Sequence, residues 1–303
     1  YIFNEKGNFE GKNILIENNL KISTEERNKI RKLEEILLIE RNKRNKPEFD
    51  NKSQTDQNCF LLETLLVSSL ITENKPLKLQ TIKDIENIEN YLSKKIFHCY
   101  QDTEIDAFLE DYVYFASLMI TKYEIDGDEL NINKSKEILI KAWDNFFDKK
   151  SGLLQKNKVN ENDLFVQPID LNDNNIPNGN SIYLNLCNKL YTITNDKIWL
   201  EKIDLLKKSF HQVLNSNYAQ MFSFVKTLDI CNENISFSFY GNIEMAVDIK
   251  KYLLNNFIGR AVFNYKNINE KDCNIVICKN QTCSNKLSNI NEIKDYLEKN
   301  KIT

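Results

Sequence analysis

The residues with the clearest chemical potential lie in one polar stretch, Gln167–Ser181, which reads QPIDLNDNNIPNGNS. Pro177 fixes its own φ and lacks an N–H group, Gly179 can adopt a positive φ, and the neighbouring asparagines tolerate left-handed conformations. The stretch ends in Asn180 and Ser181, which we expect to cap the helix that follows. A rigid polar loop at a helix N-terminus presents side chains together with free N–H groups, and this suits anionic or hydroxyl-rich ligands. A capped turn without a ligand is the alternative.

Two cysteines near the end of the chain, Cys278 and Cys283, are separated by four residues, and Cys273 precedes them. A structural zinc site needs four ligands, and the sequence offers no fourth cysteine or nearby histidine, so we expect no metal. Cys278 ends an expected strand and Cys283 follows a short loop, so the pair could close into a disulfide. Two reduced structural thiols are the alternative. The seven cysteines form no framework of the secreted type, which favours a reducing cytoplasm.

The composition is that of a folded, mainly helical protein. Of its 303 residues, 41% are hydrophobic and 11% aromatic, and the few glycines (seven) and prolines (four) disfavour a turn-rich β fold. The net charge is −3, and glutamates alternate with the basic residues between Arg27 and Lys46, as on a solvated helix face. We therefore expect no nucleic-acid partner. Because no run approaches the ~18 apolar residues of a spanning helix, we also expect no membrane partner.

Hydrophobic periodicity and capping residues predict a series of helices joined by short turns. Ser23 and Glu26 form a capping-box pattern before a first helix that extends to about Asn45. The run 105–123 is apolar on nearly all sides, so we expect that helix to be buried. The other helices are expected at 57–71, 79–97, 134–147, 181–194, 196–214 and 219–230. Repeated helical hairpins of this length are typical of a toroid or superhelix.

The pattern changes after about residue 232. Alternating residues predict strands, and amphipathic runs predict two further helices. The strands are expected at 235–240, 261–265 and 274–277, and the helices at 243–257 and 290–299. We therefore divide the chain into a helical toroid at residues 1–232 and a small α/β element at residues 233–303 that packs on it.

Five segments, in order along nearly the whole chain, carry a family resemblance. They are GNFEGKNIL at 7–15, DNK at 50–52 with Asn58, LEDY at 109–112, the polar stretch, and ICKNQTC at 277–283. They resemble the GN(W/F)EGKNIL, DDKxxxxWN, LDDYA, RPK(D/E)xxDGAxPSGNS and VCxNxTC segments of thioredoxin-domain-containing proteins of the spermatogenesis-associated protein 20 type, which include bacterial YyaL-like proteins. Ordered matches of this extent identify the chain as similar to that family.

The resemblance implies a fold and a partner. Members of the family carry an N-terminal thioredoxin-like domain, followed by an (α/α)6 toroid of the kind found in six-hairpin glycosidases and sugar 2-epimerases. The chain begins at Tyr1, where the family's linker would follow the thioredoxin-like domain. We therefore expect a C-terminal part of a longer protein, with that domain as its partner. Eight expected helices are fewer than twelve, so either the toroid is incomplete or it uses further segments that the helical pattern does not indicate. The family implies no established reaction, and we expect no cofactor.

The resemblance also indicates where a carbohydrate would bind. Glycosidic cleavage needs two carboxyl groups that flank the scissile bond. Glu110 and Asp111 are neighbours about 100° apart around a helix, so they cannot both face one pocket. The predicted catalytic pair is therefore Asp111 with Asp173, two family positions on different elements; the alternative is that Asp111 is a buried structural hydrogen-bonder. The candidate substrate-binding residues are Asn58, Glu110, Tyr112, Pro177, Gly179, Asn180 and Ser181.

Several positions depart from the family pattern: Gln57 replaces a tryptophan, Gln167 an arginine and Ile169 a lysine, and Asn174 and Asn175 stand in place of glycine and alanine. Loss of the two cationic side chains removes groups that could clamp an anion, so weakened binding or eroded catalysis is one expectation. An epimerase would need a base–acid pair, which is usually histidine in this fold. We interpret His98 and His211 as structural, which argues against epimerase chemistry.

The sequence thus leaves competing functional hypotheses. The first is a toroid that binds or acts on a carbohydrate, with Asp111 and Asp173 in its pocket. The second is a non-catalytic scaffold that serves a thioredoxin-like domain in redox work or protein quality control. A helical interaction module with a vestigial pocket is the third. Carboxylates in one open pocket would favour the first, and a filled centre with exposed Cys278 and Cys283 the second.

Overall fold

The computed structural model describes residues 1–17, 21–100, 105–159, 167–242, 247–266, 272–280 and 282–302. These residues form two compact units, Tyr1–Asn51 and Lys52–Thr303. The domain boundary placed near residue 232 therefore lies inside the second unit, next to the end of a helix. Within the described ranges, every helix is too short or too polar to cross a membrane.

The first unit contains helix α1 (Thr24–Asn42), which begins at the predicted capping box. The Ser23 hydroxyl accepts the Glu26 N–H at 3.2 Å, and the Glu26 carboxylate accepts the Ser23 N–H at 2.8 Å. Two orphan donors at the helix start are satisfied in this way. Before the helix, the chain folds back on itself through an antiparallel bridge between Ile2 and Ile16.

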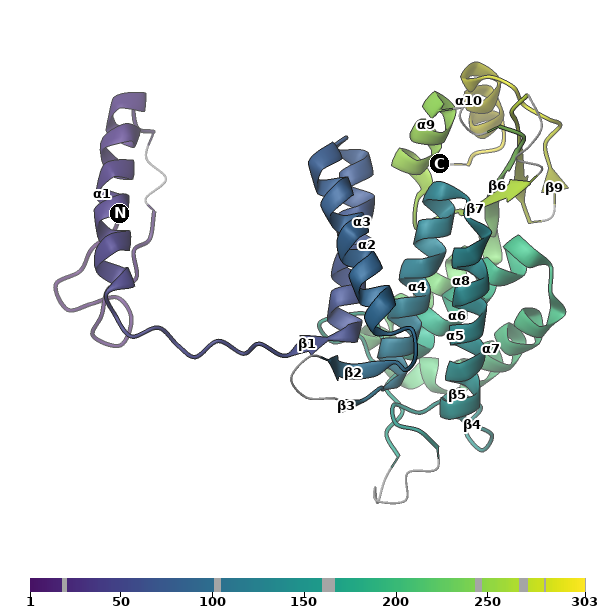
Figure 1. The fold of residues 1–303 in the computed structure, drawn as a ribbon, viewed down its shortest axis with the longest axis horizontal. Coiled ribbons are helices and arrows are strands. Elements are labelled where there is room, and N and C mark those ends of the chain that lie inside the picture. The colour runs from purple at the N-terminus through teal and green to yellow at the C-terminus, as the bar shows by residue number, and fades with distance from the viewer. Residues whose placement is uncertain are drawn as a thin grey trace. The chain divides into compact units, whose positions relative to one another are not determined.

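The second unit is built mainly from helical hairpins (Figure 1). Its first seven helices are α2 (Thr55–Ile71), α3 (Lys75–Tyr91), α4 (Leu109–Asp126), α5 (Glu129–Phe146), α6 (Gly179–Thr194), α7 (Lys197–Asn217) and α8 (Phe222–Glu233). α2 packs on α3 and α4, α4 packs on α5 and α6, and α6 packs on α7 and α8. Alternate helices thus form two rows, as consecutive hairpins do in an (α/α) toroid. The expected mainly helical fold is confirmed, as an arc of such a ring within the described residues.

Asparagine and aspartate caps set the limits of α6 and α7. Asn178 is the N-cap of α6, since its side chain accepts the Ser181 N–H at 2.9 Å, so the expectation that Asn180 and Ser181 form the cap is wrong. The tight turn after α6 follows the prediction. Asn195 ends the helix with a φ of 57°, and the Asp196 side chain accepts the N–H of the second residue of α7 at 3.1 Å.

A small sheet at the N-terminal ends of α2 and α4 was not predicted. We expected a helix up to residue 97, but α3 ends at Tyr91, and Phe97–Tyr100 forms strand β2. β2 pairs antiparallel with β1 (Ser53–Gln54) and with β3 (Ile105–Asp106). Aromatic and β-branched residues near Phe97 favour extended backbone. As a result, His98 comes from a strand that lies beside the first turn of α2.

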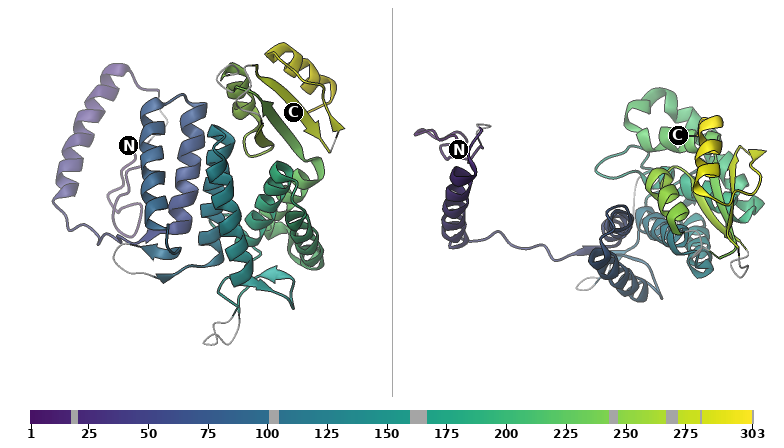
Figure 2. Two further views of the ribbon diagram at one scale, coloured as in Figure 1. Left: turned by 45° about the vertical axis from the view of Figure 1, so that its right-hand side comes forward. Right: turned by 90° about the horizontal axis from the view of Figure 1, so that it is seen from above.

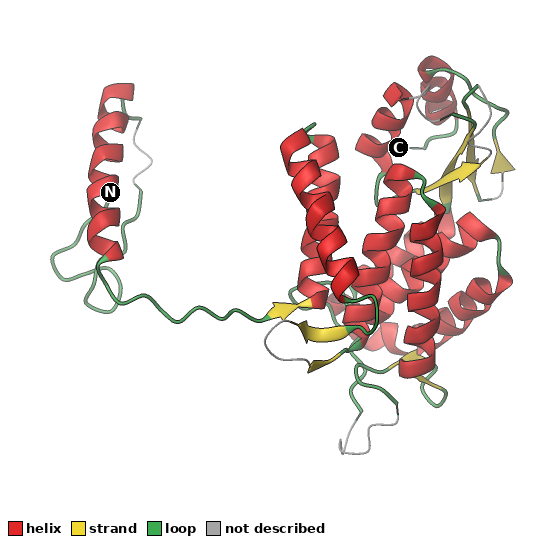
Figure 3. Ribbon diagram, viewed as in Figure 1, coloured by secondary structure: helices red, strands yellow, loops and turns green. Residues whose placement is uncertain are grey.

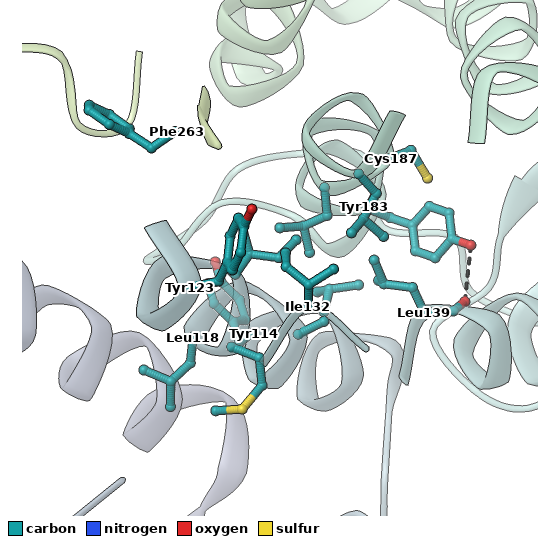
Figure 4. Packing of buried hydrophobic residues seen from close by; sticks show 14 of the residues in the cluster. Tyr114, Leu118, Tyr123, Ile132, Leu139, Tyr183, Cys187 and Phe263 are labelled. Atoms are coloured by element: carbon teal, nitrogen blue, oxygen red, sulfur yellow. Dashed lines mark hydrogen bonds between the residues drawn. The ribbon is translucent and has the colours of Figure 1, made fainter. Parts of the chain in front are cut away.

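The core centres on α4, which is buried on nearly all sides, as predicted. Figure 4 shows its side chains packed between those of α5, α6 and the C-terminal sheet. Most polar atoms in this core have a partner; the Tyr183 hydroxyl, for example, donates to the Leu139 carbonyl at 3.0 Å. The labelled residues are Tyr114, Leu118, Tyr123, Ile132, Leu139, Tyr183, Cys187 and Phe263.

The C-terminal part is the small α/β element that we expected (Figure 3). Its strands are β6 (Ile235–Tyr240), β7 (Val262–Lys266), β8 (Asn274–Lys279) and β9 (Thr282–Cys283), and its helices are α9 (Val247–Phe257) and α10 (Ile290–Lys299). β6 pairs parallel with β7 and antiparallel with β8, which pairs with β9. α9 connects the parallel strands, and β7 packs on α4 and α6. Residues 243–246 of the helix expected at 243–257 lie outside the described residues.

Two views of the unit show α2 and α3 standing side by side (Figure 2). A two-stranded sheet, β4 (Phe147–Asp148) with β5 (Leu153–Leu154), follows α5. A 3₁₀ turn at Tyr218–Gln220 links α7 to α8. These short elements and the polar loop before α6 surround the part of the molecule that holds most of the predicted site residues.

Candidate functional site

The polar loop, β5 and the start of α4 are tied together by backbone hydrogen bonds. The Lys156 N–H donates to the Pro168 carbonyl at 2.8 Å, and the Lys156 carbonyl accepts the Leu109 N–H at 3.1 Å. Asn180 adds a side-chain link, since its amide both donates to the Leu154 carbonyl (2.8 Å) and accepts the Leu154 N–H (2.9 Å). The first turns of α4 and α6 are therefore held against one another at this end of the helical unit.

Asp173 supports the loop from within. One carboxylate oxygen accepts the Asn178 N–H at 3.0 Å and the Asn178 side-chain amide at 2.9 Å. The other oxygen accepts the Ser223 N–H at 2.6 Å, at the start of α8. Asp173 thus fastens the loop to α8, and both of its oxygens are occupied by this task.

Asp111 is enclosed at the start of α4, and its side chain has no exposed area. One oxygen accepts the Phe108 N–H at 2.8 Å, and the other accepts the Asp56 N–H at 3.1 Å. His98 Nδ1 lies 3.1 Å from Asp111 Oδ1. Burial raises the pKa of Asp111, while the hydrogen bond with His98 lowers it. The structure therefore places Asp111 as a buried hydrogen-bond acceptor, and the predicted catalytic pair with Asp173 presents no free carboxylate oxygen to a ligand.

Glu110 differs from both aspartates. Among the described residues, its Oε2 is buried and has no hydrogen-bond partner. The pKa of Glu110 is raised to about 6, mainly by burial and also by the charge of Asp170, whereas the charge of Lys156 lowers it. A carboxyl group with this pKa is partly protonated near neutral pH and can donate a proton or a hydrogen bond. An unpaired buried oxygen of this kind is costly, so a ligand hydroxyl would be a favourable partner.

Asp170 is the acidic partner that the sequence analysis missed. It lies in the polar loop, its side chain is 42% exposed, and it pairs with Lys156 at 3.3 Å. The predicted acidic residue of the motif is Asp173, and only the fold brings the charge of Asp170 close enough to raise the pKa of Glu110. One carboxyl group is thus buried and the other is exposed and ion-paired, which is how two carboxyl groups acquire different roles.

Gly179 permits the close contact between α4 and α6. A Cβ atom at this position would lie 2.9 Å from Glu110 Oε1 and 3.0 Å from the Leu109 side chain. Pro177 is fixed from α4, because the Tyr114 hydroxyl donates to its carbonyl at 2.8 Å. Gly179 therefore lies against Glu110, and Pro177 is fixed by a hydrogen bond from the same helix, α4.

Three of the remaining predicted binding residues have hydrogen-bond partners, whereas the buried Ser181 hydroxyl has none among the described residues. Asn58 donates its side-chain amide to the Gln54 carbonyl at 2.7 Å, and the Tyr112 hydroxyl accepts from the Asn145 amide at 3.3 Å. Asn180 and Ser181 have no exposed area. These residues hold the site together, and the exposed polar groups available to a ligand come from other positions.

Asn180 provides a direct test of this architecture. Replacement by alanine would remove the paired amide bonds to Leu154 and leave buried backbone groups without partners. We expect Asn180→Ala to lower the free energy of unfolding by about 2–4 kcal/mol, since each unsatisfied buried group costs roughly 1–3 kcal/mol. Chemical denaturation followed by circular dichroism measures this change. A loss within about 0.5 kcal/mol, the usual range for surface substitutions, would contradict the role assigned to Asn180.

Three side chains could approach a metal ion. Asp56, His98 and Asp111 each place one possible ligand atom within 4.8 Å of the others. The hydrogen bond with Asp111 raises the pKa of His98, while burial lowers it. His98 Nε2 also lies 3.1 Å from the Gln54 side-chain amide. A cation at this point would have to replace the contact between His98 and Asp111, which already pairs the imidazole with a carboxylate.

Cys278 and Cys283 form a disulfide between β8 and β9. The two residues lie directly opposite one another in the antiparallel pair. Cys283 is exposed and Cys278 is partly buried. The pair is therefore at the surface of the small α/β element, in a different part of the unit from Glu110.

Comparisons with known proteins give the following matches. No protein-family model matches the chain, and no curated protein does. Two solved chains of the α-1,6-mannanase from Salegentibacter sp. HEL1_6 are similar to it. An inactive variant in complex with α-1,6-mannotriose is 18% identical over 62% of this chain and 55% of that chain, with a TM-score of 0.41. The other mannanase structure is 20% identical over 61% and 54%, also with a TM-score of 0.41. The chain thus spans about half the length of the mannanase.

Proposed function

We propose that the helical unit binds and acts on a neutral carbohydrate at the N-terminal ends of α4 and α6, with Glu110 as its proton donor. The observation that carries this proposal is the buried Glu110 carboxyl group, which has an unpaired oxygen and a pKa of about 6. Asp170 is the second carboxyl group, exposed to an incoming ligand and ion-paired with Lys156. Glycosidic cleavage uses two carboxyl groups, one of which donates a proton, and Glu110 with Asp170 could fill these roles.

The same residues favour a neutral ligand over an anionic one. Gln167 and Ile169 stand where the resembling family has arginine and lysine, so the loop lacks two groups that would clamp an anion. Lys156 already has Asp170 as its partner. A protonated Glu110 can donate a hydrogen bond to a sugar hydroxyl, and Asp170 can accept one.

A panel of neutral oligosaccharides, tested for binding by calorimetry and for cleavage by product analysis, examines the proposal. We expect at least one member to be bound and cleaved by the wild type, and Asp170→Asn to lower turnover by about 10²–10⁴-fold. Asp106→Asn is the matched control, because Asp106 is also exposed and pairs with a lysine at 2.7 Å. Equal losses in both variants, or no interaction with any member of the panel, would refute the proposal.

A second candidate function rests on the disulfide. We propose that the chain belongs to a longer cytoplasmic protein with a thioredoxin-like domain, and that Cys278 and Cys283 exchange thiols with that domain. The support is the ordered resemblance along the chain and the surface position of the cysteine pair. The enclosed side chain of Asp111 also supports this alternative, because a scaffold is expected to have a filled centre. In the exchange, two thiols of the domain become a disulfide while the Cys278–Cys283 bond is reduced to two thiols.

Alkylation with mass spectrometry tests this exchange. We expect Cys278 and Cys283 to resist alkylation in the native chain and to become reactive together after incubation with a reduced thioredoxin. The control is Cys273→Ser, which removes the nearby free thiol and should leave the result unchanged. Free reactivity before reduction, or no reduction by thioredoxin when dithiothreitol succeeds, would exclude the exchange.

A further inference from the structure

A pocket of about 820 Å³ lies at the other end of α4 from Glu110. It is formed by the ends of α2 and α4, the start of α3 and one face of α9. Since α4 has 18 residues and a helix rises 1.5 Å per residue, the pocket is roughly 25 Å from the carbohydrate site. Its volume falls within the ~300–1,000 Å³ typical of small-molecule sites.

Some charged side chains of the pocket form ion pairs and others do not. Lysines 75, 78, 250 and 251 line it, together with Glu73 and Asp126. Lys251 pairs with Glu73 at 2.6 Å. Asp126 accepts the Asp128 N–H at 2.8 Å and also lies near the Asn131 amide at 3.3 Å. Within the described part of the chain, Lys78 and Lys250 form no ion pair, so this wall has an excess of positive charge.

Lys250 is held in place by its surroundings. Its ammonium group lies 4.9 Å from the centroid of the Tyr265 ring. The pKa of Lys250 is lowered to about 8, mainly by burial; the charge of Asp126 raises it and the charge of Lys78 lowers it. Two ammonium groups near one another in a partly enclosed pocket repel, and an anion between them would relieve that repulsion.

The rest of the wall is apolar. Leu70, Ile125 and Leu254 line the pocket beside the lysines. Apolar area next to a fixed cation suits a ligand that has an anionic group on a hydrophobic body. Inorganic phosphate alone would leave this part of the pocket in contact with water.

We propose that this pocket binds a small-molecule anion with an apolar body, a carboxylate or phosphate monoester whose charged group lies between Lys78 and Lys250. The site is separate from the carbohydrate site and does not depend on it. Leu70 and Ile125 contact the apolar body, and Lys251 with Glu73 borders the pocket.

Calorimetry on the full chain with phenyl phosphate and benzoate tests the proposal. Phenol and inorganic phosphate test the apolar body and the anionic group separately. We expect at least one of the two aromatic anions to bind, and phenol and inorganic phosphate to bind at least about tenfold more weakly. Lys250→Met and Lys78→Met should each weaken binding by about 10–100-fold, as expected for loss of a hydrogen bond to a charged group. Preference for phenyl phosphate or for benzoate identifies the anionic group.

Lys294→Met is the matched control, because Lys294 also lies over a tyrosine ring, that of Tyr252 at 5.1 Å, but does not line the pocket. Binding should be unchanged in this variant and in Glu110→Gln. Failure of both aromatic anions to bind at ~10 mM, or full affinity in Lys78→Met and Lys250→Met, would overturn the proposal. Lys78 is on the first turn of α3, so its variant tests the site even if Lys250→Met fails to fold.

Discussion

Glu110→Gln is expected to abolish most turnover of any oligosaccharide that the protein cleaves, with a loss of about 10²–10⁴-fold in kcat/KM. Glutamine has nearly the shape of glutamate and can still form hydrogen bonds, but it cannot transfer a proton. Because Asp111 and Asp173 have their oxygens occupied, no neighbouring aspartate of the predicted pair can replace Glu110 as the acid. Steady-state assays across pH 4–8 measure the loss.

The same substitution should stabilise the free protein above pH 6. Folding raises the pKa of Glu110 from 4.5 to about 6. The contribution of this group to the free energy of unfolding is therefore fully present below pH 4.5 and is lost as the pH rises through 6. At about 1.4 kcal/mol per pKa unit, ionisation costs the folded state up to about 2 kcal/mol at pH 8. Glu110→Gln removes this cost, and the gain should vanish below pH 4.5.

Glu63→Gln is a suitable control for both effects. Glu63 lies on α2, is partly buried, and accepts the Thr121 hydroxyl at 2.8 Å, a bond that an amide oxygen can also accept. We expect little change in activity or in stability, because the bond from Thr121 is kept. Denaturation at pH 4 and pH 8 compares the two variants. A Glu110→Gln protein that keeps full turnover would contradict the role of Glu110 as the acid.

Lys189→Met is expected to cause the largest loss of stability, about 3–5 kcal/mol, because it leaves a buried charge without its partner. Lys189 Nζ lies 2.7 Å from Glu124 Oε2, and the two side chains are 10% and 1% exposed. Glu124 Oε1 also lies near the Phe263 N–H, at 3.4 Å. The pair therefore joins α6, α4 and β7 at the point where the helical arc meets the C-terminal sheet.

Two further variants separate the ion pair from other effects. Glu124→Gln combined with Lys189→Met should recover much of the loss, since neither residue then carries a buried charge. Lys251→Met breaks the exposed pair with Glu73 and should cost no more than about 1 kcal/mol. Urea denaturation gives all three values. Equal losses for Lys189→Met and Lys251→Met would show that burial of the first pair has no energetic consequence.

The sequence could predict the features that depend on local patterns. The capping box at Ser23, the turn at Asn195 and the buried helix α4 each arise from residues within one or two helical turns, although the helix predicted at 105–123 begins at Leu109, after the strand Ile105–Asp106. The change to an α/β element after residue 232 was predictable for the same reason, because strand and helix periodicities differ. The possible closure of Cys278 and Cys283 also followed from a strand followed by a short loop.

The features that depend on distant contacts could not be predicted in this way. His98 meets Asp111 only because residues 97–100 form a strand rather than the end of a helix. Glu110 and Asp111 were judged by their positions on one helix, but they meet different tertiary partners: Glu110 lies against Gly179 of α6, whereas Asp111 contacts Asp56 and His98. Asp170 is a candidate because it pairs with Lys156, whose backbone forms hydrogen bonds with both the loop and α4. Residue types and their spacing along the sequence do not indicate these tertiary contacts.

The most direct test of the central claim is the pKa of the Glu110 side chain, measured by carboxyl-carbon NMR in the wild type and assigned by Glu110→Gln. The proposed function predicts a value of about 6 in the free protein and a shift when an oligosaccharide from the panel is added. A value near 4.5 that no oligosaccharide changes would show that Glu110 is an ordinary solvated carboxylate, and the carbohydrate proposal would then fail.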